Sequence, residues 1–137
     1  MTLSRSMAGA LAEARAAEKD QSLYYRTLAA AAEEAEDTLL AERLNGLHAD
    51  EQHHLSRLTA RLVEAGFPVN DLPGTPPPVP ALDVWEAEAR ERELGEVARY
   101  RALLEMALDA RTKLMLTEFL AAEERHAEEL GGKWMGA

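Results

Sequence analysis

A chain of 137 residues is long enough for one domain with a single sizeable core. Its formal net charge of −10 excludes nucleic acid and anionic membrane surfaces as expected partners, because both would repel it. The chain has no cysteine, so it can hold no disulfide, zinc–thiolate site or iron–sulfur centre. Alanine, leucine, glutamate and arginine dominate and aromatic residues make up 5%, a composition that predicts an all-α protein.

Neither a signal peptide nor a membrane span is predicted. Arg5, Glu13 and Arg15 interrupt the alanine-rich N-terminal region, which therefore lacks the continuous apolar stretch of a signal peptide. Nowhere does the chain offer the roughly 18 uncharged apolar residues that suggest a transmembrane helix. We expect residues 1–137 to form one domain of a cytoplasmic protein that has no membrane partner.

Four helices are predicted, at residues 4–35, 38–65, 83–108 and 111–131. Apolar residues spaced three and four apart mark one face of each helix. Breaks at 36–38 and near Asp109 separate the helices within each half of the chain. Gly66 is expected to end the second helix, and Asp83 with Glu86 to form a capping box that opens the third. Residues 131–137 follow the last helix and are expected to be mobile.

All six prolines lie in the segment 66–81, which therefore cannot be helical. At ~3 Å per residue in an extended conformation, this segment is about 40 Å long and can run the length of a helical bundle. The short breaks within each half make antiparallel neighbours of the first and second helices, and of the third and fourth. The sequence therefore predicts an antiparallel four-helix bundle with one long Pro-rich crossover, which is the ferritin-like connectivity.

Acidic and histidine residues occupy positions that should face the core of these helices. The second helix carries Glu51-x-x-His54 within its apolar stripe, and the fourth carries Glu123-x-x-His126. Core positions of the other two helices are taken by glutamates, Glu18 on the first and Glu93 and Glu96 on the third. An uncompensated carboxylate in a core costs several kcal/mol, a large share of the roughly 5–15 kcal/mol that stabilises a domain. Something cationic must therefore accompany these side chains.

Counting from the two short turns at ~1.5 Å per residue places these groups at similar heights, in one layer near the middle of the bundle. One glutamate from each of two helices and Glu-x-x-His from each of the other two form the ligand set of di-iron and di-manganese carboxylate bundles. Carboxylates can bridge two ions, and imidazole is a neutral donor suited to iron. The sequence predicts a centre of two iron ions, with manganese as the alternative metal.

At these residues the chain resembles the rubrerythrin branch of the ferritin-like superfamily. The resemblance covers the whole four-helix region and includes Glu18-x6-Tyr25, Glu51-x-x-His54, Glu93-x-x-Glu96 and Glu123-x-x-His126. The two halves of the chain also repeat each other, since Tyr100 follows Glu93 by seven residues as Tyr25 follows Glu18. The resemblance implies that Glu18, Glu51, Glu93 and Glu123 are metal carboxylates, with Glu51 and Glu123 as bridges, and that His54 and His126 are the imidazole ligands. It also implies that Glu96 replaces His54 on the oxidised iron. Glu96, Tyr25 and Tyr100 are the candidate catalytic residues.

The resemblance implies reduction of hydrogen peroxide at the di-iron centre with electrons from a rubredoxin-like domain. A chain without cysteine cannot contain that domain, so we expect an external electron donor. The principal prediction is thus a redox enzyme that uses hydrogen peroxide or dioxygen. The alternatives are a ferritin-like ferroxidase that stores iron and a helical interaction module with a remnant site. A homo-oligomer, a dimer or larger, is expected, and the enzyme predicts a small oligomer whereas the store predicts a large hollow one.

Overall fold

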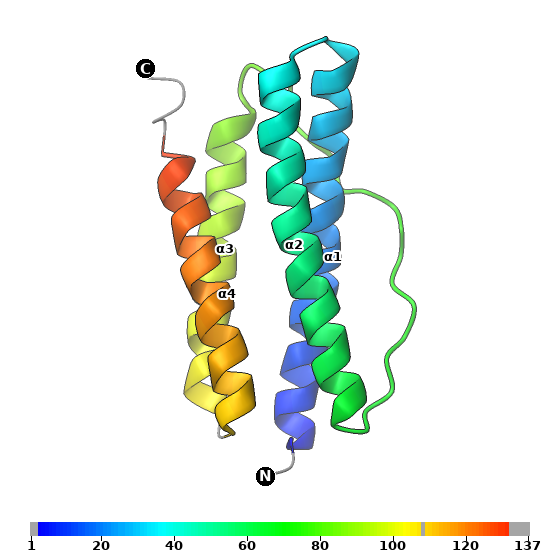
Figure 1. Cartoon of the computed structure of the whole chain (residues 1–137), viewed down its shortest axis with the longest axis vertical. Helices are drawn as coiled ribbons and strands as arrows, with labels where there is room; N and C mark the ends of the chain where they lie inside the picture. Colours follow the sequence, from blue (N-terminus) through cyan, green and yellow to red (C-terminus); the bar gives the residue numbers. More distant parts are fainter. Residues whose placement is uncertain (1–2, 108, 132–137) are drawn as a thin grey trace. The chain divides into compact units, whose positions relative to one another are not determined.

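The computed structural model describes residues 3–107 and 109–131, which form four α-helices and no strand (Figure 1). The helices are α1 (Arg5–Glu34), α2 (Thr38–Glu64), α3 (Trp85–Met106) and α4 (Ala110–Glu129). The prediction of an all-α chain is confirmed, and no helix end differs from its predicted position by more than two residues. None of the described helices is both long and apolar enough to cross a membrane. The predicted mobile tail falls, apart from Gly131, outside the described residues.

The chain forms two compact units. The first-hairpin unit comprises Leu11–Leu82, with most of α1, all of α2 and the Pro-rich segment. The second-hairpin unit comprises Met1–Ala10 and Asp83–Ala137, with the start of α1 and all of α3 and α4. The organisation of residues 1–137 as a single domain stays a prediction.

In the first-hairpin unit, α1 and α2 run side by side in opposite directions (Figure 1). Leu28 of α1 and Leu44 and Leu58 of α2 are fully buried, as their places on the apolar stripes predict. Exposed polar side chains also join the two helices, since the Asn45 amide of α2 donates to Glu33 Oε2 of α1 at 3.3 Å. Hydrogen bonds from Arg26 and Asn45 lower the pKa of the exposed Glu33 carboxyl.

The turn between α1 and α2 places a non-glycine residue in the left-handed region. Glu36 has a φ of 59°, and the next amide, that of Asp37, donates to Ala32 O at 2.9 Å, as in a Schellman ending of α1. The Asp37 side chain then accepts from Leu40 N at 3.2 Å and caps α2. A side chain other than glycine is strained at this φ, and the sequence alone gave no sign of that strain.

Replacing Glu36 by glycine is therefore expected to stabilise the protein by about 0.5–1 kcal/mol. Glycine removes the steric cost of the positive φ, which outweighs the greater freedom it gives to the unfolded chain. The measurement is the free energy of unfolding in urea. The matched variant is Glu34→Gly, in the last turn of α1, which should destabilise instead.

The Pro-rich segment has no regular structure from residue 67 to 81 and connects α2 to α3, as predicted. The end of α2 is also as expected, since Gly66 follows it with a φ of 84° and the Phe67 amide donates to Leu62 O at 3.0 Å. Arg15 Nη1 donates to Asn70 O at 2.8 Å, so α1 holds the segment at this point.

In the second-hairpin unit, α3 and α4 pack against each other, and Asp109 caps α4 by accepting from Thr112 N at 3.0 Å and Thr112 Oγ1 at 2.9 Å. The capping box predicted at Asp83 and Glu86 is wrong. Helix α3 begins at Trp85 after the N-cap residue Val84, which has no side-chain cap. Glu86 therefore stands two residues after the N-cap rather than the three that a capping box requires.

Candidate metal centre

Two carboxylates and one imidazole meet in the core of the first-hairpin unit. We call Glu18 of α1 and Glu51 and His54 of α2 the first triad. His54 Nδ1 lies 3.6 Å from Glu18 Oε2 and 4.0 Å from Glu51 Oε1. One ligand atom of each residue lies within 4.8 Å of the others. The two glutamates are 0% exposed and His54 is 3% exposed, so the first triad is enclosed by protein.

The second-hairpin unit repeats this arrangement. We call Glu93 of α3 and Glu123 and His126 of α4 the second triad. His126 Nδ1 lies 3.6 Å from Glu93 Oε2 and 3.0 Å from Glu123 Oε1, the latter within hydrogen-bond distance. One ligand atom of each residue is again within 4.8 Å of the others, and all three side chains are buried. Each hairpin thus carries three potential metal ligands of the same types.

Helix geometry explains why each triad converges. Residues three apart on a helix lie on one face, so Glu51 and His54 point the same way, as do Glu123 and His126. The stripe continues with buried apolar residues on either side of each pair, for example Leu47 and Leu58 on α2. These buried neighbours place each Glu-x-x-His pair in the core of its hairpin.

The buried side chains carry a strong excess of negative charge. Glu18, Glu51, Glu86, Glu93, Glu96 and Glu123 are all buried, whereas no lysine or arginine is buried among residues 3–107 and 109–131. Two imidazoles, even if both were protonated, could not neutralise the four carboxylates of the two triads. Buried carboxylates in such numbers require cations, and the donor set of oxygen and imidazole nitrogen suits iron, manganese or zinc. The residues present therefore fit a metal site.

Glu96 lies on the buried side of α3, one turn beyond Glu93. Its side chain is 10% exposed, and Oε2 is 3.8 Å from Nε of Arg99, which lies three residues further on. Among the described residues, the clusters with ligand atoms within 4.8 Å of one another do not include Glu96. Glu96 thus forms a long ion pair with Arg99, and a ligand role for Glu96 stays a prediction.

Tyr25 and Tyr100 are fully buried, each in edge contact with another aromatic ring. The ring centroids of Tyr24 and Tyr25 are 5.5 Å apart, and those of Tyr100 and Phe119 are 5.6 Å apart. Such contacts anchor aromatic rings in a core. The part that either hydroxyl plays in catalysis stays a prediction.

Two buried polar residues near the first triad were not singled out from the sequence. Gln21 and Ser22 are 2% and 0% exposed and follow Glu18 by three and four residues, on the same face of α1. Their spacing from Glu18 could have predicted from the sequence that both side chains are buried beside the first triad. Nδ1 of His48 on α2 lies 2.9 Å from Ser22 O and 3.2 Å from Ser22 Oγ. These contacts tie α1 to α2 on the side of the triad toward the turn.

Comparison with known proteins identifies similar folds among solved structures but does not assign the chain to a protein family. No protein-family model matches the sequence, and no curated protein matches it. Among solved structures, bacterioferritin BfrA from Mycobacterium tuberculosis is similar with a TM-score of 0.88 and 19% identity, over 98% of this chain and 87% of that chain. An open-pore ferritin from the archaeon Archaeoglobus fulgidus is similar with a TM-score of 0.83 and 19% identity, over 94% of this chain and 83% of that chain.

At 19% sequence identity, these similarities show the fold of the chain and not its function. Both similar structures cover nearly the whole chain, 98% and 94% of it. The predicted fold class is therefore confirmed: the chain has the all-α, ferritin-like four-helix bundle fold.

Proposed function

We propose that this protein is a ferritin-like ferroxidase that binds two iron ions and oxidises Fe(II). The observation that carries the proposal is the pair of buried triads, whose carboxylates no buried lysine or arginine neutralises among the described residues. The ferritin-like fold adds support, because bacterioferritin and ferritin are the similar structures. Four carboxylates neutralise two divalent cations, which offsets the cost of burying them. A pair of iron ions can supply two electrons together to an oxidant.

The residues have distinct roles in this proposal. Glu18 and His54 bind one iron ion, and Glu93 and His126 bind the other. Glu51 and Glu123, each three residues before a histidine ligand, are the proposed bridges between the two ions. The apolar residues around each triad keep the carboxylates in place and restrict the entry of water. We expect a cytoplasmic homo-oligomer, with manganese as the alternative metal.

A second candidate function is rubrerythrin-like reduction of hydrogen peroxide with electrons from an external donor. The observation that favours it is Glu96, an additional carboxylate on the buried side of α3, one turn from Glu93. In this function Glu96 would exchange with His54 as a ligand when the iron is oxidised. The two candidates share the metal site and differ in the oxidant and in the fate of the iron.

Anaerobic titration with Fe(II), followed by rapid mixing of the loaded protein with dioxygen or with peroxide, tests these proposals. Saturation at two iron ions per chain with faster oxidation by dioxygen, or uptake of much more iron in air, supports the ferroxidase. Much faster oxidation by peroxide, with no uptake beyond two ions, supports the peroxidase. Absence of tight binding of iron and of manganese contradicts both.

Substitution of Glu96 by alanine separates the two functions further. As a ferroxidase the variant should bind two iron ions and react with dioxygen within about threefold of the unchanged protein. As a peroxidase it should bind the ions but lose at least about tenfold in its rate with peroxide, comparable to the loss of a residue that supports a metal ligand. Stopped-flow absorbance measures both rates. The matched control is Glu91→Ala, on the exposed side of α3, which should change neither rate.

A further inference from the structure

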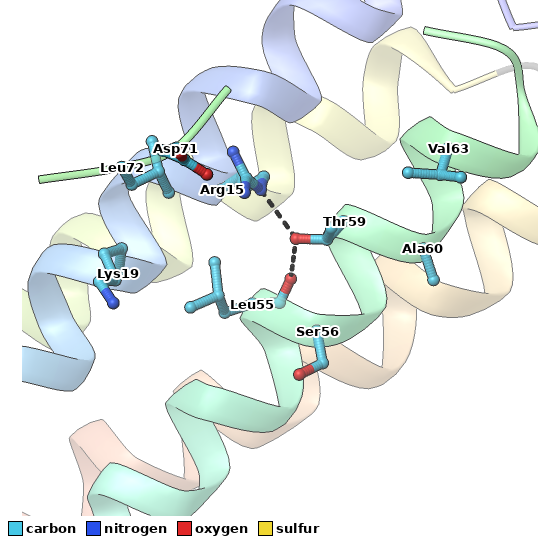
Figure 2. A pocket seen from close by; sticks show the side chains of 9 residues that line it. All are labelled: Arg15, Lys19, Leu55, Ser56, Thr59, Ala60, Val63, Asp71 and Leu72. Carbon is cyan, nitrogen blue, oxygen red and sulfur yellow. Dashed lines mark hydrogen bonds between the residues drawn. The ribbon is translucent and has the colours of Figure 1, made fainter. Parts of the chain in front are cut away.

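An open groove lies in the first-hairpin unit, between α1, α2 and the Pro-rich segment (Figure 2). Its volume is about 640 Å³, within the roughly 300–1,000 Å³ typical of small-molecule sites. None of the residues that line the groove belongs to the first triad, and Lys19 and Leu55 each lie one residue, or about 100° around the helix, beyond Glu18 and His54. The groove is therefore a separate site from the proposed metal centre.

Arg15 is held in the groove by hydrogen bonds to two different elements. Its Nε donates to Thr59 Oγ1 at 2.7 Å, and its Nη1 donates to Asn70 O at 2.8 Å (Figure 2 shows the bond to Thr59). The Thr59 hydroxyl is itself fixed, because it donates to Leu55 O at 2.9 Å. A guanidinium has five N–H donors, so donors remain for a ligand. The side chain is thus positioned in advance, which lowers the entropic cost of binding.

The groove is cationic in an acidic protein. Lys19 follows Arg15 by one helical turn and lines the same groove, and Asp71 is the one acidic residue that lines it. Neither Arg15 nor Lys19 forms an ion pair with any residue that the structure describes. Two cations and one carboxylate leave the groove with a net charge of about +1, against −10 for the whole chain. A net charge of about +1 in the groove favours the binding of a monoanion over that of a cation or a multiply charged anion.

The remainder of the groove is largely apolar. Leu55 and Val63 come from α2 and Leu72 from the Pro-rich segment, and Val63 is 56% exposed. Apolar side chains next to fixed cations suit a ligand that has a charged head and a hydrophobic tail.

We propose that this groove binds an amphipathic monocarboxylate of moderate length. The carboxylate contacts the free N–H groups of Arg15 and the ammonium group of Lys19, and the hydrocarbon tail lies against Leu55, Val63 and Leu72. The ligand then connects α1, α2 and the Pro-rich segment, so its binding stabilises the first-hairpin unit. This inference does not depend on the proposed redox function.

The test is isothermal titration of the full chain with octanoate, with octylammonium as a probe of equal length and opposite charge. We expect one saturable octanoate site per chain and at least tenfold weaker binding of octylammonium. The variant Lys19→Gln should weaken octanoate binding about fivefold, the effect of one partly exposed charge. Lys113→Gln makes the same change on the exposed side of α4 and should leave binding unchanged.

A second variant, Val63→Glu, places a carboxylate at the apolar wall and should weaken octanoate binding by more than tenfold. Val63 is largely exposed, so helical content measured by circular dichroism should be retained. The proposal is overturned if octanoate does not saturate a site, if octylammonium binds equally well, or if Lys19→Gln has no effect. It is also overturned if the unchanged protein is an oligomer that does not bind octanoate and the Val63→Glu variant is dissociated. A second copy of the chain would then cover the groove.

Discussion

Replacement of Glu51 or Glu123 by glutamine is expected to abolish the paired binding of iron. Each residue belongs to a buried triad and is a proposed bridge, so its loss affects both ions. Glutamine keeps the size of the side chain but lacks the charge that a bridging ligand supplies. Loss of a group that merely supports a ligand costs roughly 10–100-fold in metal affinity, so loss of a bridge should exceed about 100-fold. Anaerobic Fe(II) titration measures the effect.

The matched control for this prediction is Glu42→Gln, which removes the same charge from the exposed side of α2. It should bind two iron ions as the unchanged protein does. Retention of two tightly bound ions by either Glu51→Gln or Glu123→Gln would refute the assignment of the bridges, and retention by both would refute the centre itself.

In the absence of metal, the substitution Glu123→Gln is expected to stabilise the fold by about 1–3 kcal/mol. The reason is the crowding of acidic side chains, since the described part of the chain buries six glutamates and no lysine or arginine. Removing one carboxylate relieves both its desolvation and its repulsion by the others. Urea unfolding in a chelating buffer measures the difference. With metal present the order should reverse, because ligand at a thousand times its Kd stabilises the unchanged protein by about 4 kcal/mol.

The opposite result would be equally informative. If Glu123→Gln destabilises the metal-free protein, the contact of Glu123 with His126 at 3.0 Å outweighs the repulsion between carboxylates. The triads would then be stable polar networks in their own right, and the need for a cation, which carries the proposed function, would disappear.

Periodicity made the helices and their buried faces predictable. Glu18, Glu51 and Glu93 take positions in stripes of apolar residues, and all three are buried as those stripes require. The start of α3 was less predictable, because Asp83 and Glu86 satisfy a local capping pattern that the chain does not use. Pairs of residues that satisfy a capping motif are common in acidic sequences, and the turn before the helix decides which residue is the cap.

Contacts that depend on the path of irregular segments could not be predicted. The hydrogen bond from Arg15 to Asn70 joins residues that lie 55 positions apart and requires the particular course of a segment without regular structure. The pairing of Glu96 with Arg99 depends on side-chain rotamers, which the spacing of residues on a helix does not determine. The spacing of residues therefore predicted correctly that Glu96 lies on the buried side of α3. It did not predict that its carboxylate lies near Arg99.

Each triad is encoded within a single helical hairpin, and this has a consequence for which insertions and deletions the protein can accept. If a residue added to the short turn after Glu34 or after Met106 joins the adjoining helix, it shifts that helix against its partner by ~1.5 Å and rotates it by about 100°, which moves a glutamate away from its histidine. A change of length in the Pro-rich segment, beyond Asn70, leaves the register of both hairpins as it was. Variation in chain length should therefore accumulate between residues 73 and 81, beyond the residues that line the groove, and be rare in the two turns.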